Sequence, residues 1–528
     1  MPPVDPPGQA AEADVCLVLE GTYPYIKGGV STWVHELVGS LPELRFALVH
    51  IAPARGTYPR RLYALPDNVV ALTDLYCREP LARGRDSAAL ERAARAERHR
   101  HARAHRSSRV LHGIRRLHLE DEAAASPLDD LASGDLSVGA FLHGRASYEL
   151  MTELYERLAP GASFLDFFWH FRSMHLPLVR LLGAEPPAAT LYHAVCTGYA
   201  GLLAAAWSRR AGRPFLLTEH GIYSRERNFE LDRAAWLRET RDTRARDGTD
   251  GGIDSATAAA LRRMWARFFR VLARCAYDRA SSIVSLCEVS RQRQIADGAP
   301  ADRTRIIPNG VDLEGFLARV RGGPPRPAAR GPVRVGFVGR MVPIKDVITF
   351  IRACSLVLQV ADVEVRLFGP IDEDRGYARR CRRLVARLGL ERAIRFETSR
   401  PIEHIYPELD IVVLTSLSEG QPLVILEANA AGIPVVASDV GACRELIEGR
   451  SDADRRLGPS GIVTRLAAPE ETAAAIARLA RDPELRRRMG AAGQRRVATF
   501  YRKSATVSTY RALYTEGPWP ASAGASSA

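Results

Sequence analysis

The segment from Asp410 to Ser438 restricts the fold most strongly, because its pattern predicts a parallel βαβ unit. It opens with DIVVLTS, a β-branched apolar run that is typical of a strand buried on both faces. It closes with IPVVAS, which predicts a second short strand. Between them, Pro422 suits the first position of a helix and Gly432 suits its left-handed end. Parallel strands joined by a helix predict an α/β domain with a doubly wound sheet.

Two carboxylates interrupt this apolar segment. Glu419 falls in the turn after the first strand, and ligands of open α/β sheets bind at the carboxyl ends of strands. Glu427 lies about one helical turn further along. Carboxylates accept hydrogen bonds, so two of them beside one crevice suit a polyhydroxyl ligand such as a sugar or a ribose. The alternative is a charge for the helix dipole and a surface glutamate, and the segment alone does not decide between them.

The same alternation of strands and helices occurs on both sides of a Pro/Gly/Arg-rich stretch at residues 319–332, which we interpret as a linker. We therefore expect a GT-B type of α/β architecture, in which two Rossmann-like doubly wound domains face a cleft. The expected boundaries are 14–325 for the first domain, about 73–185 and 225–280 for its helical insertions, 332–496 for the second domain, and 497–516 for a last helix that could return to the first.

The net charge of +13 raises the question of an anionic partner. Much of the basic excess lies between Glu91 and His118, a block rich in alanine, arginine and histidine. This block could bind anionic lipid or an acidic partner, but we favour a solvated helical insertion. The sequence contains no motif of interleaved aromatic and basic residues, so we expect no nucleic-acid binding.

The apolar segment from Ala188 to Trp207 is about long enough to cross a membrane, but His193 and Gly198 interrupt it. A strand at 190–195, a glycine turn and a buried helix from Tyr199 fit it better.

The first residues, MPPVDPPGQAAEAD, have neither the basic start nor the apolar core of a signal peptide. Eight scattered cysteines form no CxxC pair and indicate neither a zinc cluster nor a disulfide framework, so we expect a cytoplasmic protein.

Lysine is rare, since the 74 basic residues include only Lys27, Lys345 and Lys503. Arginine cannot replace lysine where a compact point charge is needed, so the remaining lysines are candidates for sites. Lys345 and Arg340 lie in VGRMVPIKD, directly after a predicted strand. Backbone N–H groups at such a strand end, together with the two cations, suit a diphosphate. The alternative is a pair of surface bases in a loop, and for Lys503 we expect a structural role.

The order of these motifs resembles a known family. Gly-Arg with a lysine five positions later, then Glu-x7-Glu within the segment that includes PLVILEANAAGIPVVAS, resembles the retaining glycosyltransferases of family four, which have a GT-B fold. CLVLEGTYPYIKGGVSTWVHELV, YHAVCTGYAGLLAA, TEHGIY and PNGVD extend the resemblance to the first half. The whole set is most similar to the PelF-type glycosyltransferases of bacterial Pel exopolysaccharide synthesis.

The resemblance implies roles for the residues of the second half. Glu427 holds the ribose hydroxyls of a nucleotide sugar, and Glu419 lies against the transferred sugar. Arg340 and Lys345 neutralise the diphosphate as it leaves. Further donor contacts are implied at Gly420, Gln421, Leu423, Val424 and Gly29. The family often has Phe-Gly where this chain has Gln421-Pro422, and the proline removes one possible N–H donor.

The resemblance also implies roles in the first half. His220, after the predicted strand FLLTE, lies near the primary hydroxyl of the transferred sugar and belongs to the catalytic set with Glu419. His193 faces the acceptor at another strand end. Gly28 lies in the glycine turn that approaches the donor phosphates or the acceptor, and Lys27 assists there. A lone histidine is more often structural, and the strand-end placement is what favours function here.

The implied reaction is the retaining transfer of a sugar from a UDP-sugar, either UDP-glucose or UDP-N-acetylhexosamine, to a growing exopolysaccharide. The implied partner is a membrane-bound polysaccharide synthase complex, which would place the protein at the periphery of the inner membrane. No cofactor and no metal are expected. Asp372 and Asp374 form a D-x-D pattern that could bind a divalent ion, although we favour a solvated acidic loop. The alternatives are a nucleotide-sugar 2-epimerase and a basic nucleic-acid-binding protein.

Overall fold

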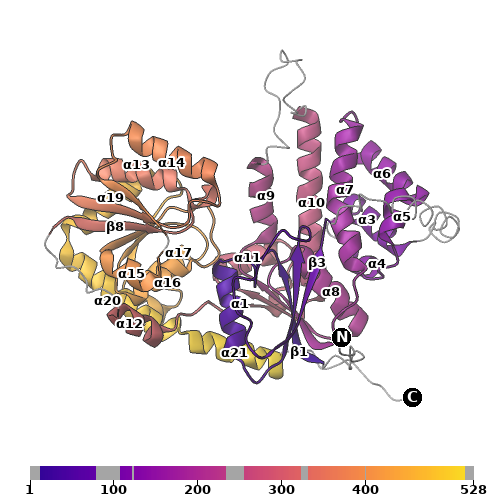
Figure 1. The fold of residues 1–528 in the computed structure, drawn as a ribbon, viewed down its shortest axis with the longest axis horizontal. Coiled ribbons are helices and arrows are strands. Elements are labelled where there is room, and N and C mark those ends of the chain that lie inside the picture. The colour runs from indigo at the N-terminus through magenta and orange to yellow at the C-terminus, as the bar shows by residue number, and fades with distance from the viewer. Residues whose placement is uncertain are drawn as a thin grey trace, which may run out of the picture. The chain divides into compact units, whose positions relative to one another are not determined.

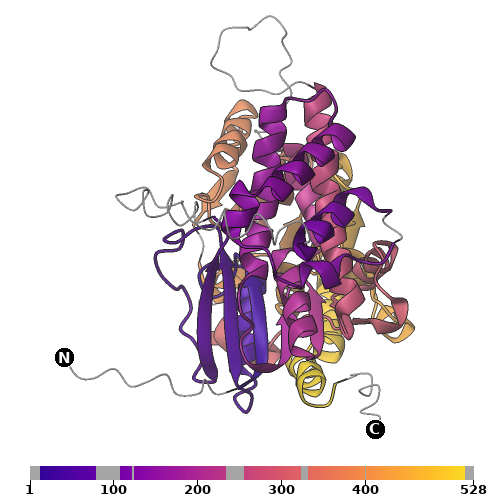
Figure 2. The ribbon, with the colours of Figure 1, turned by 90° about the vertical axis from the view of Figure 1, so that its right-hand side faces the viewer.

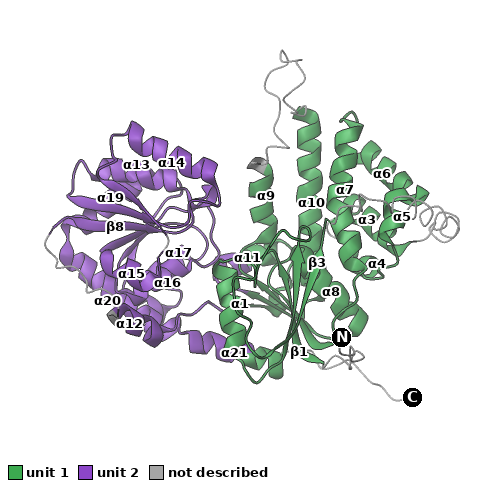
Figure 3. Ribbon diagram, in the orientation of Figure 1, with its two compact units in different colours: residues 1–284, 292–305, 511–528 green, residues 285–291, 306–510 purple. Residues whose placement is uncertain are grey.

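The computed structural model describes residues 12–78, 108–121, 124–233, 255–322, 331–398 and 400–517. The chain divides into two compact units (Figure 3). Unit 1 comprises residues 1–284, 292–305 and 511–528, and unit 2 comprises residues 285–291 and 306–510. Each unit contains one β-sheet with its own hydrophobic core.

Unit 1 is built on a seven-stranded sheet in the order β3-β2-β1-β4-β5-β6-β7 (Figure 1). The pairs among β1 to β5 are parallel. The central strands are mostly apolar and mostly buried, as is typical of parallel strands covered on both faces. The strands are β1 Ala13–Glu20, β2 Phe46–Ala52, β3 Val69–Tyr76, β4 Ala189–Ala194, β5 Phe215–Glu219, β6 Ser282–Ser285 and β7 Thr304–Ile306.

The helices of unit 1 include a large insertion between β3 and β4. The insertion begins after Tyr76, slightly later than the expected residue 73, because VVALTDLY pairs with β2 as a strand. Figures 1 and 2 show its helix α7 running beside α10. The helices are α1 Gly29–Gly39, α3 Arg109–Leu119, α4 Leu128–Leu131, α5 Val138–His143, α6 Arg145–Leu158, α7 Phe164–Leu182, α8 Tyr199–Ala211, α9 Tyr223–Arg233 and α10 Ser255–Arg279, with the short 3-10 turn η3 Ala301–Arg303. Helix α11 Glu288–Ala296 begins in unit 2 and continues into unit 1 at Gln292.

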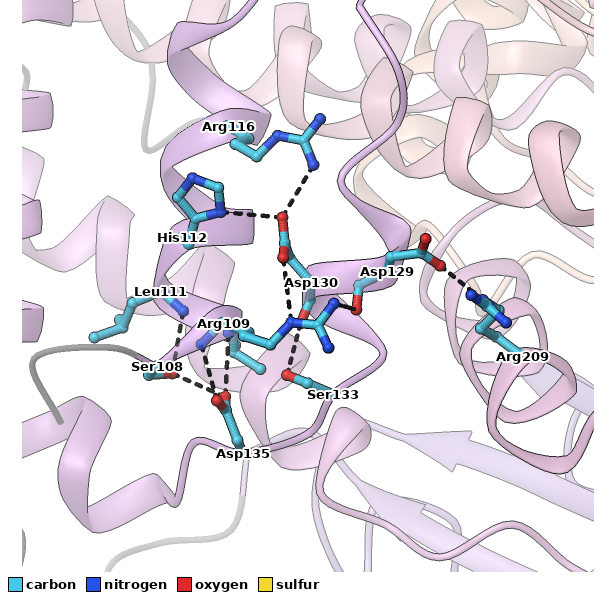
Figure 4. A network of polar contacts seen from close by, with 11 residues as sticks. Ser108, Arg109, Leu111, His112, Arg116, Asp129, Asp130, Ser133, Asp135 and Arg209 are labelled. Carbon is cyan, nitrogen blue, oxygen red and sulfur yellow. Dashed lines mark hydrogen bonds and ion pairs between the residues drawn. The ribbon is translucent and has the colours of Figure 1, made fainter. Parts of the chain in front are cut away.

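Asp135 fixes the start of α3 (Figure 4). Its carboxylate accepts hydrogen bonds from the backbone N–H groups of Arg109 and Val110, at 2.8 and 3.1 Å, and from the Ser108 hydroxyl at 2.9 Å. Partial burial favours a higher pKa for Asp135, but these hydrogen bonds outweigh it and hold the pKa below its usual value. The helix end that follows residues 79–107 is therefore held by a carboxylate of the insertion itself.

Asp130 pairs with the basic side chains of α3. It accepts hydrogen bonds from His112 Nδ1 and Arg116 Nη1, both at 3.0 Å, and lies 3.4 Å from Arg109 Nε. Residues 91–107 of the basic block lie outside the described residues. In the described part, these bases stabilise the insertion by pairing with its own acid.

Unit 2 is built on a six-stranded sheet in the order β10-β9-β8-β11-β12-β13, and every neighbouring pair in it is parallel. The strands are β8 Val333–Val338, β9 Val363–Phe368, β10 Ile394–Glu397, β11 Ile411–Leu414, β12 Val435–Ser438 and β13 Gly461–Thr464. The helices are α12 Leu313–Gly322, α13 Val347–Val357, α14 Arg375–Arg387, α15 Ile402–Ile405, α16 Leu423–Ala430, α17 Cys443–Glu448, α18 Asp452–Arg455, α19 Pro469–Arg481 and α20 Pro483–Phe500, with 3-10 turns η4 Pro343–Lys345 and η5 Tyr406–Glu408.

The βαβ unit predicted at residues 410–438 is confirmed as β11, α16 and β12. Gly432 ends the helix with a φ of 71°, as expected for a left-handed end. Pro422 lies one position earlier than predicted, at the N-cap, and the helix begins at Leu423. Because a proline side chain has no hydrogen-bond acceptor, the start of α16 has no side-chain cap.

The apolar segment at 188–207 forms β4 and the first part of α8, as the sequence predicted. Among the helices of the described ranges, none combines the length and the apolar character needed to cross a bilayer.

The last helix, α21 Lys503–Thr515, passes from unit 2 into unit 1 at Arg511. Within unit 1, Arg511 pairs with Glu43 at 2.6 Å, and the Tyr514 ring packs edge-on against Phe46. Within unit 2, Lys503 donates its backbone N–H to Val311 at 3.1 Å.

A buried ion pair holds α20 in unit 2. Arg496 and Asp454 are 0% and 2% exposed, and their side chains approach to 2.6 Å. The remaining guanidinium N–H groups donate to the carbonyls of Ile447 and Gly458, at 2.7 and 2.8 Å. Burial makes this arrangement sensitive, because removing one partner leaves the other charge uncompensated.

We expect Asp454→Ala to lower the free energy of unfolding of unit 2 by roughly 3–5 kcal/mol, since it strands the Arg496 charge in the core. The matched control is Asp452→Ala, whose side chain is 85% exposed and should change the stability by less than about 0.5 kcal/mol. Urea unfolding followed by circular dichroism, with hydrogen exchange of α20 peptides, measures both. Equal losses in the two variants would contradict the structural importance of the pair.

Candidate functional site

The order of strand addition in unit 2 reverses between β8 and β11. The chain places β9 and β10 on one side of β8 and then returns to add β11 on its other side. The loops that follow β8 and β11 therefore diverge, which opens a crevice at the carboxyl edge of the sheet. These two loops carry Lys345 and Glu419.

Backbone contacts hold the two loops together. Leu417 donates its N–H to the Ile344 carbonyl at 2.8 Å, and the Thr415 hydroxyl donates to the Asp346 carbonyl at 2.9 Å. Asp346 has a φ of 43°, and its carboxylate accepts from the N–H of Thr349 to cap α13. Asp346, the strained residue next to Lys345, is thus held by hydrogen bonds to its carbonyl and to its carboxylate. These bonds fix the backbone from which the Lys345 side chain extends.

Lys345 and Glu419 form an ion pair. Their side chains are 19% and 11% exposed, so solvent screens the pair only weakly. The Ser416 hydroxyl donates to the same Glu419 oxygen at 2.6 Å. The structure therefore brings together two residues, 74 positions apart, that sequence reasoning assigned to one site, and it makes them direct partners.

The turn that carries Glu419 packs on a glycine that sequence reasoning missed. Gly441 has a φ of 53°, and a Cβ there would come within 2.0 Å of the Glu419 carbonyl oxygen. Next to it, Ala442 donates its N–H to the Gly420 carbonyl at 2.8 Å. The signal in the sequence is the position of this glycine, three residues after the strand IPVVAS.

The side chain of Gln421 is 7% exposed and accepts a hydrogen bond from the Asn309 N–H at 2.6 Å. It therefore holds the PNGVD segment against the turn. Beyond it, Leu423 and Val424 are the first residues of α16, and this end has no side-chain cap. The partial positive charge of the helix N-terminus faces the same loop end as Glu419.

Glu427 is anchored by a buried tyrosine. The Tyr406 hydroxyl donates to Glu427 Oε2 at 2.6 Å, and Tyr406 is fully buried. Burial, followed by the neighbouring Glu427 charge, raises the pKa of Tyr406 well above its usual value, so the tyrosine remains a donor. Sequence reasoning missed Tyr406, because nothing in its local pattern connects it to a helix 21 residues further on.

Arg340 is about half exposed and pairs with Glu373, the middle residue of the DED motif. Asp374 caps α14 by accepting from the Tyr377 N–H at 2.8 Å, and Asp372 lies 3.6 Å from Arg375. The two aspartates thus have separate structural partners. In the described part of the chain, no group of three or more His, Cys, Asp or Glu side chains is arranged to hold a metal ion.

The sheet of unit 1 has its own reversal, between β1 and β4, and both histidines lie at strand ends in this region. His193 is fully buried, and its Nδ1 and Nε2 contact Tyr514 Oη and Thr218 Oγ1, each at 2.9 Å. Burial, then the nearby His220, lowers the pKa of His193 to about 3. Both ring nitrogens of His193 therefore have hydrogen-bond partners within unit 1.

His220 differs from His193 in its hydrogen bonding. Burial lowers its pKa to about 4, so the ring is neutral at pH 7. Its ring packs edge-on against Trp33 at 4.5 Å between centroids. Within the described ranges, its buried Nε2 has no hydrogen-bond partner. A buried polar atom without a partner calls for an explanation, such as an ordered water or a ligand.

Lys27, Gly28 and Gly29 are exposed at the start of α1. A Cβ at either glycine would meet no atom within 4 Å. The φ of Gly28 is 169°, an extended value that other residues also adopt. The contacts of the described chain therefore do not require glycine here.

Two family matches divide the chain as the structure does. Residues 13–302 match the family described as domain of unknown function (DUF3492), which covers more than half of the chain. Residues 332–482 match the family described as glycosyl transferases group 1.

Individual relatives show the same similarity. The chain is 32% identical over 255 residues to the D-inositol 3-phosphate glycosyltransferase of Thermomonospora curvata, covering 44% of this chain and 56% of that protein. It is 26% identical over 315 residues to the MMP alpha-(1->4)-mannosyltransferase of Mycolicibacterium hassiacum, covering 58% and 66%. The chain spans about half the length of the first D-inositol 3-phosphate glycosyltransferases it matches.

Solved structures show the fold over nearly the whole chain. The Anabaena protein Alr3699/HepE in complex with UDP-glucose superposes with a TM-score of 0.55 at 16% identity, covering 95% of this chain and 99% of that one. Sucrose-phosphate synthase from Thermosynechococcus elongatus gives a TM-score of 0.56 at 15% identity, covering 95% and 98%. The expected GT-B fold of two Rossmann-like domains is thereby confirmed. Residues 332–482 match the glycosyl transferases group 1, and the chain as a whole belongs to the family of the domain of unknown function DUF3492.

Proposed function

We propose that the protein is a retaining glycosyltransferase that moves a sugar from a UDP-sugar, either UDP-glucose or UDP-N-acetylhexosamine, to a growing bacterial exopolysaccharide of the Pel type. The observation that carries the proposal is the Lys345–Glu419 pair at the strand reversal of unit 2, beside the anchored Glu427. The family match of unit 2 and the UDP-glucose in the Anabaena structure support a nucleotide-sugar donor.

The residues proposed to bind the nucleotide sugar are two carboxylates and two cations. Glu427, with one oxygen held by Tyr406, binds the ribose hydroxyls through its remaining acceptor sites. Glu419 binds hydroxyls of the transferred sugar. Lys345 and Arg340 stabilise the negative charge that develops on the leaving diphosphate, and the uncapped start of α16 adds its partial positive charge.

Breaking the sugar–phosphate bond gives an oxocarbenium-like transition state, so stabilising the leaving group is the main task. In a retaining transfer the acceptor hydroxyl attacks from the side of the leaving group, which removes the need for a strong protein base. His220, neutral and with its Nε2 unused within the described chain, then binds the primary hydroxyl of the transferred sugar. His193, whose ring nitrogens contact Tyr514 and Thr218, is assigned to the acceptor side.

The acceptor side is assigned to Lys27 and Gly28, with Gly29 near the donor. Since packing within the described chain does not require glycine at either position, the close approach of a ligand is our explanation for both.

A peripheral location at the inner membrane, beside a polysaccharide synthase, completes the proposal. Supporting it, α6 and α7 expose large apolar side chains, with Tyr148, Leu165 and Trp169 each at least half exposed. All eight cysteines are free thiols, which suits a reducing cytoplasm.

We expect UDP to raise the melting temperature more than ADP, GDP or CMP does, because the proposed donor carries uridine. A ligand at a hundred times its Kd stabilises by about 2.7 kcal/mol, which a thermal-shift panel detects. Glu427→Gln should reduce the UDP response, since a neutral amide is a weaker acceptor for ribose hydroxyls. A larger response to ADP would overturn the assignment of the base and leave the fold unaffected.

Lys345→Ala should cut turnover by roughly a hundredfold or more, the loss expected when one preorganised charge contact to a developing anion is removed. Lys345→Arg should recover only part of it, because a planar guanidinium cannot replace a compact ammonium. Steady-state kinetics measure both variants, and circular dichroism verifies folding. The matched control is Lys503→Ala, which should keep full turnover. A fully active Lys345→Ala would move the diphosphate site elsewhere.

We expect EDTA to leave transfer activity largely intact, because Arg340 and Lys345 supply the positive charge that a divalent ion supplies in other transferases. The measurement is sugar transfer before and after chelation, with added magnesium or manganese as the comparison. Activity that disappears with EDTA and returns with either ion would refute metal independence and assign Asp372 and Asp374 a new role.

A further inference from the structure

Unit 1 contains a cavity of about 550 Å³. One wall is the carboxyl edge of its sheet, with Glu20 from β1, Ala52 from β2 and Cys77 after β3. The opposite wall comes from helices α7, α9 and α10, two of which follow β5 and one of which belongs to the large insertion. Its volume lies in the range of small-molecule sites, and its position beside the β1–β4 reversal is where such sheets bind ligands.

Aromatic rings make up much of the helical wall. Trp265 and Phe269 stack with centroids 5.5 Å apart, and Tyr223 meets Phe269 edge-on at 5.7 Å. The Trp265 N–H donates to His170 Nδ1 at 3.0 Å, so the indole contributes mainly its apolar surface to the cavity. Tyr58 and Tyr199 also line the cavity.

A carboxylate is held in place at the base of this aromatic wall. Glu20 accepts a hydrogen bond from the Tyr223 hydroxyl at 2.6 Å and from the Ala200 N–H at 3.3 Å. Gly198 makes the arrangement possible, because a Cβ there would come within 2.3 Å of the Tyr223 ring and 2.6 Å of Glu20 Oε2. The Cys196 thiol is a third donor, with its Sγ 3.8 Å from Glu20 Oε2. A carboxylate offers about four acceptor positions, so Glu20 retains capacity for one ligand hydroxyl.

Two cations, Arg78 and Arg227, complete the lining. The Arg227 guanidinium lies 4.8 Å from the centre of the Tyr223 ring and pairs with Glu230 at 2.5 Å. The formal charges of the lining balance, because Glu20 and Glu230 face two arginines, so the lining favours neither an anion nor a cation. Fixed acceptors, a guanidinium donor and several aromatic faces instead suit a neutral ligand with many hydroxyls and apolar C–H faces.

We propose that this cavity binds sugar residues of the acceptor chain, with Glu20 as the main hydroxyl acceptor and the ring of Trp265 as an apolar face. The assignment rests on the proposed transferase function, and it extends the acceptor side to residues beyond Lys27 and Gly28. Tyr223 is a positioning residue, because it acts through Glu20.

The test is titration of the whole chain, without donor, with tetrasaccharides of glucose and of N-acetylgalactosamine, followed by saturation-transfer NMR. We expect saturable binding of at least one of them, weakened at least tenfold in Glu20→Gln. Tyr223→Phe, which keeps the ring and removes only the hydroxyl that orients Glu20, should weaken binding by a smaller factor and serves if Glu20→Gln fails to fold. The matched control is Glu149→Gln on α6, whose side chain is 58% exposed and lies outside the cavity lining.

A parallel UDP thermal shift separates this inference from the proposed function. A UDP response without saturable binding of either tetrasaccharide overturns the cavity assignment and leaves the donor site standing. Unchanged tetrasaccharide affinity in both Glu20→Gln and Tyr223→Phe also overturns it. Loss of the UDP response in Glu20→Gln would assign the cavity to the donor instead. Tetrasaccharide binding with no response to UDP, ADP, GDP or CMP in the unmodified protein would overturn the transferase function and the acceptor role together.

Discussion

The reversal of strand order between β8 and β11 is the constraint on which the candidate site depends. In a parallel sheet, each connection must return to the amino edge, so loops at the carboxyl edge are normally packed beside one another. Where the order of addition reverses, the two neighbouring loops separate. Lys345 and Glu419 lie on those two loops, and Thr415 and Leu417 bind the loops together at their base. The two loops are thus joined by these hydrogen bonds and by the Lys345–Glu419 ion pair.

The charges of this crevice come as pairs. Lys345 contacts Glu419 and Arg340 contacts Glu373, so each candidate diphosphate cation already has a carboxylate partner. The two pairs differ in burial, because the first is mostly shielded from solvent and the second is about half exposed. If the proposed donor binds here, its diphosphate has to compete with Glu373 in a screened environment and with Glu419 in a poorly screened one. Of the two cations, Lys345 is the less exposed, so the surrounding fold restricts its position more than that of Arg340.

The sheet of unit 1 has a strand-order reversal of the same kind, with different side chains beside it. Its reversal lies between β1 and β4, and the residues there are Glu20, Gly198 and the aromatic residues of the later helices. The helical insertion supplies α7 to the helical wall of the cavity and is stabilised internally, as the contacts of Asp130 and Asp135 show. Its described basic side chains serve that stabilisation, which agrees with the solvated-insertion interpretation of the block from Ser108 onward.

The sequence by itself determined the βαβ unit at 410–438 and the strand and helix at 188–207, because hydrophobic periodicity, glycine and proline are properties of short segments. It also marked Lys345 as a candidate site residue, because lysine is rare in the chain. The tertiary structure decided the partners. Tyr406 with Glu427, Gly441 beneath the Glu419 turn, Asp454 with Arg496 and Tyr514 with His193 join residues between 21 and 321 positions apart. No periodic signal encodes such contacts, since they arise only when the sheet order brings distant loops to one edge and the packing of helices buries one charge against another.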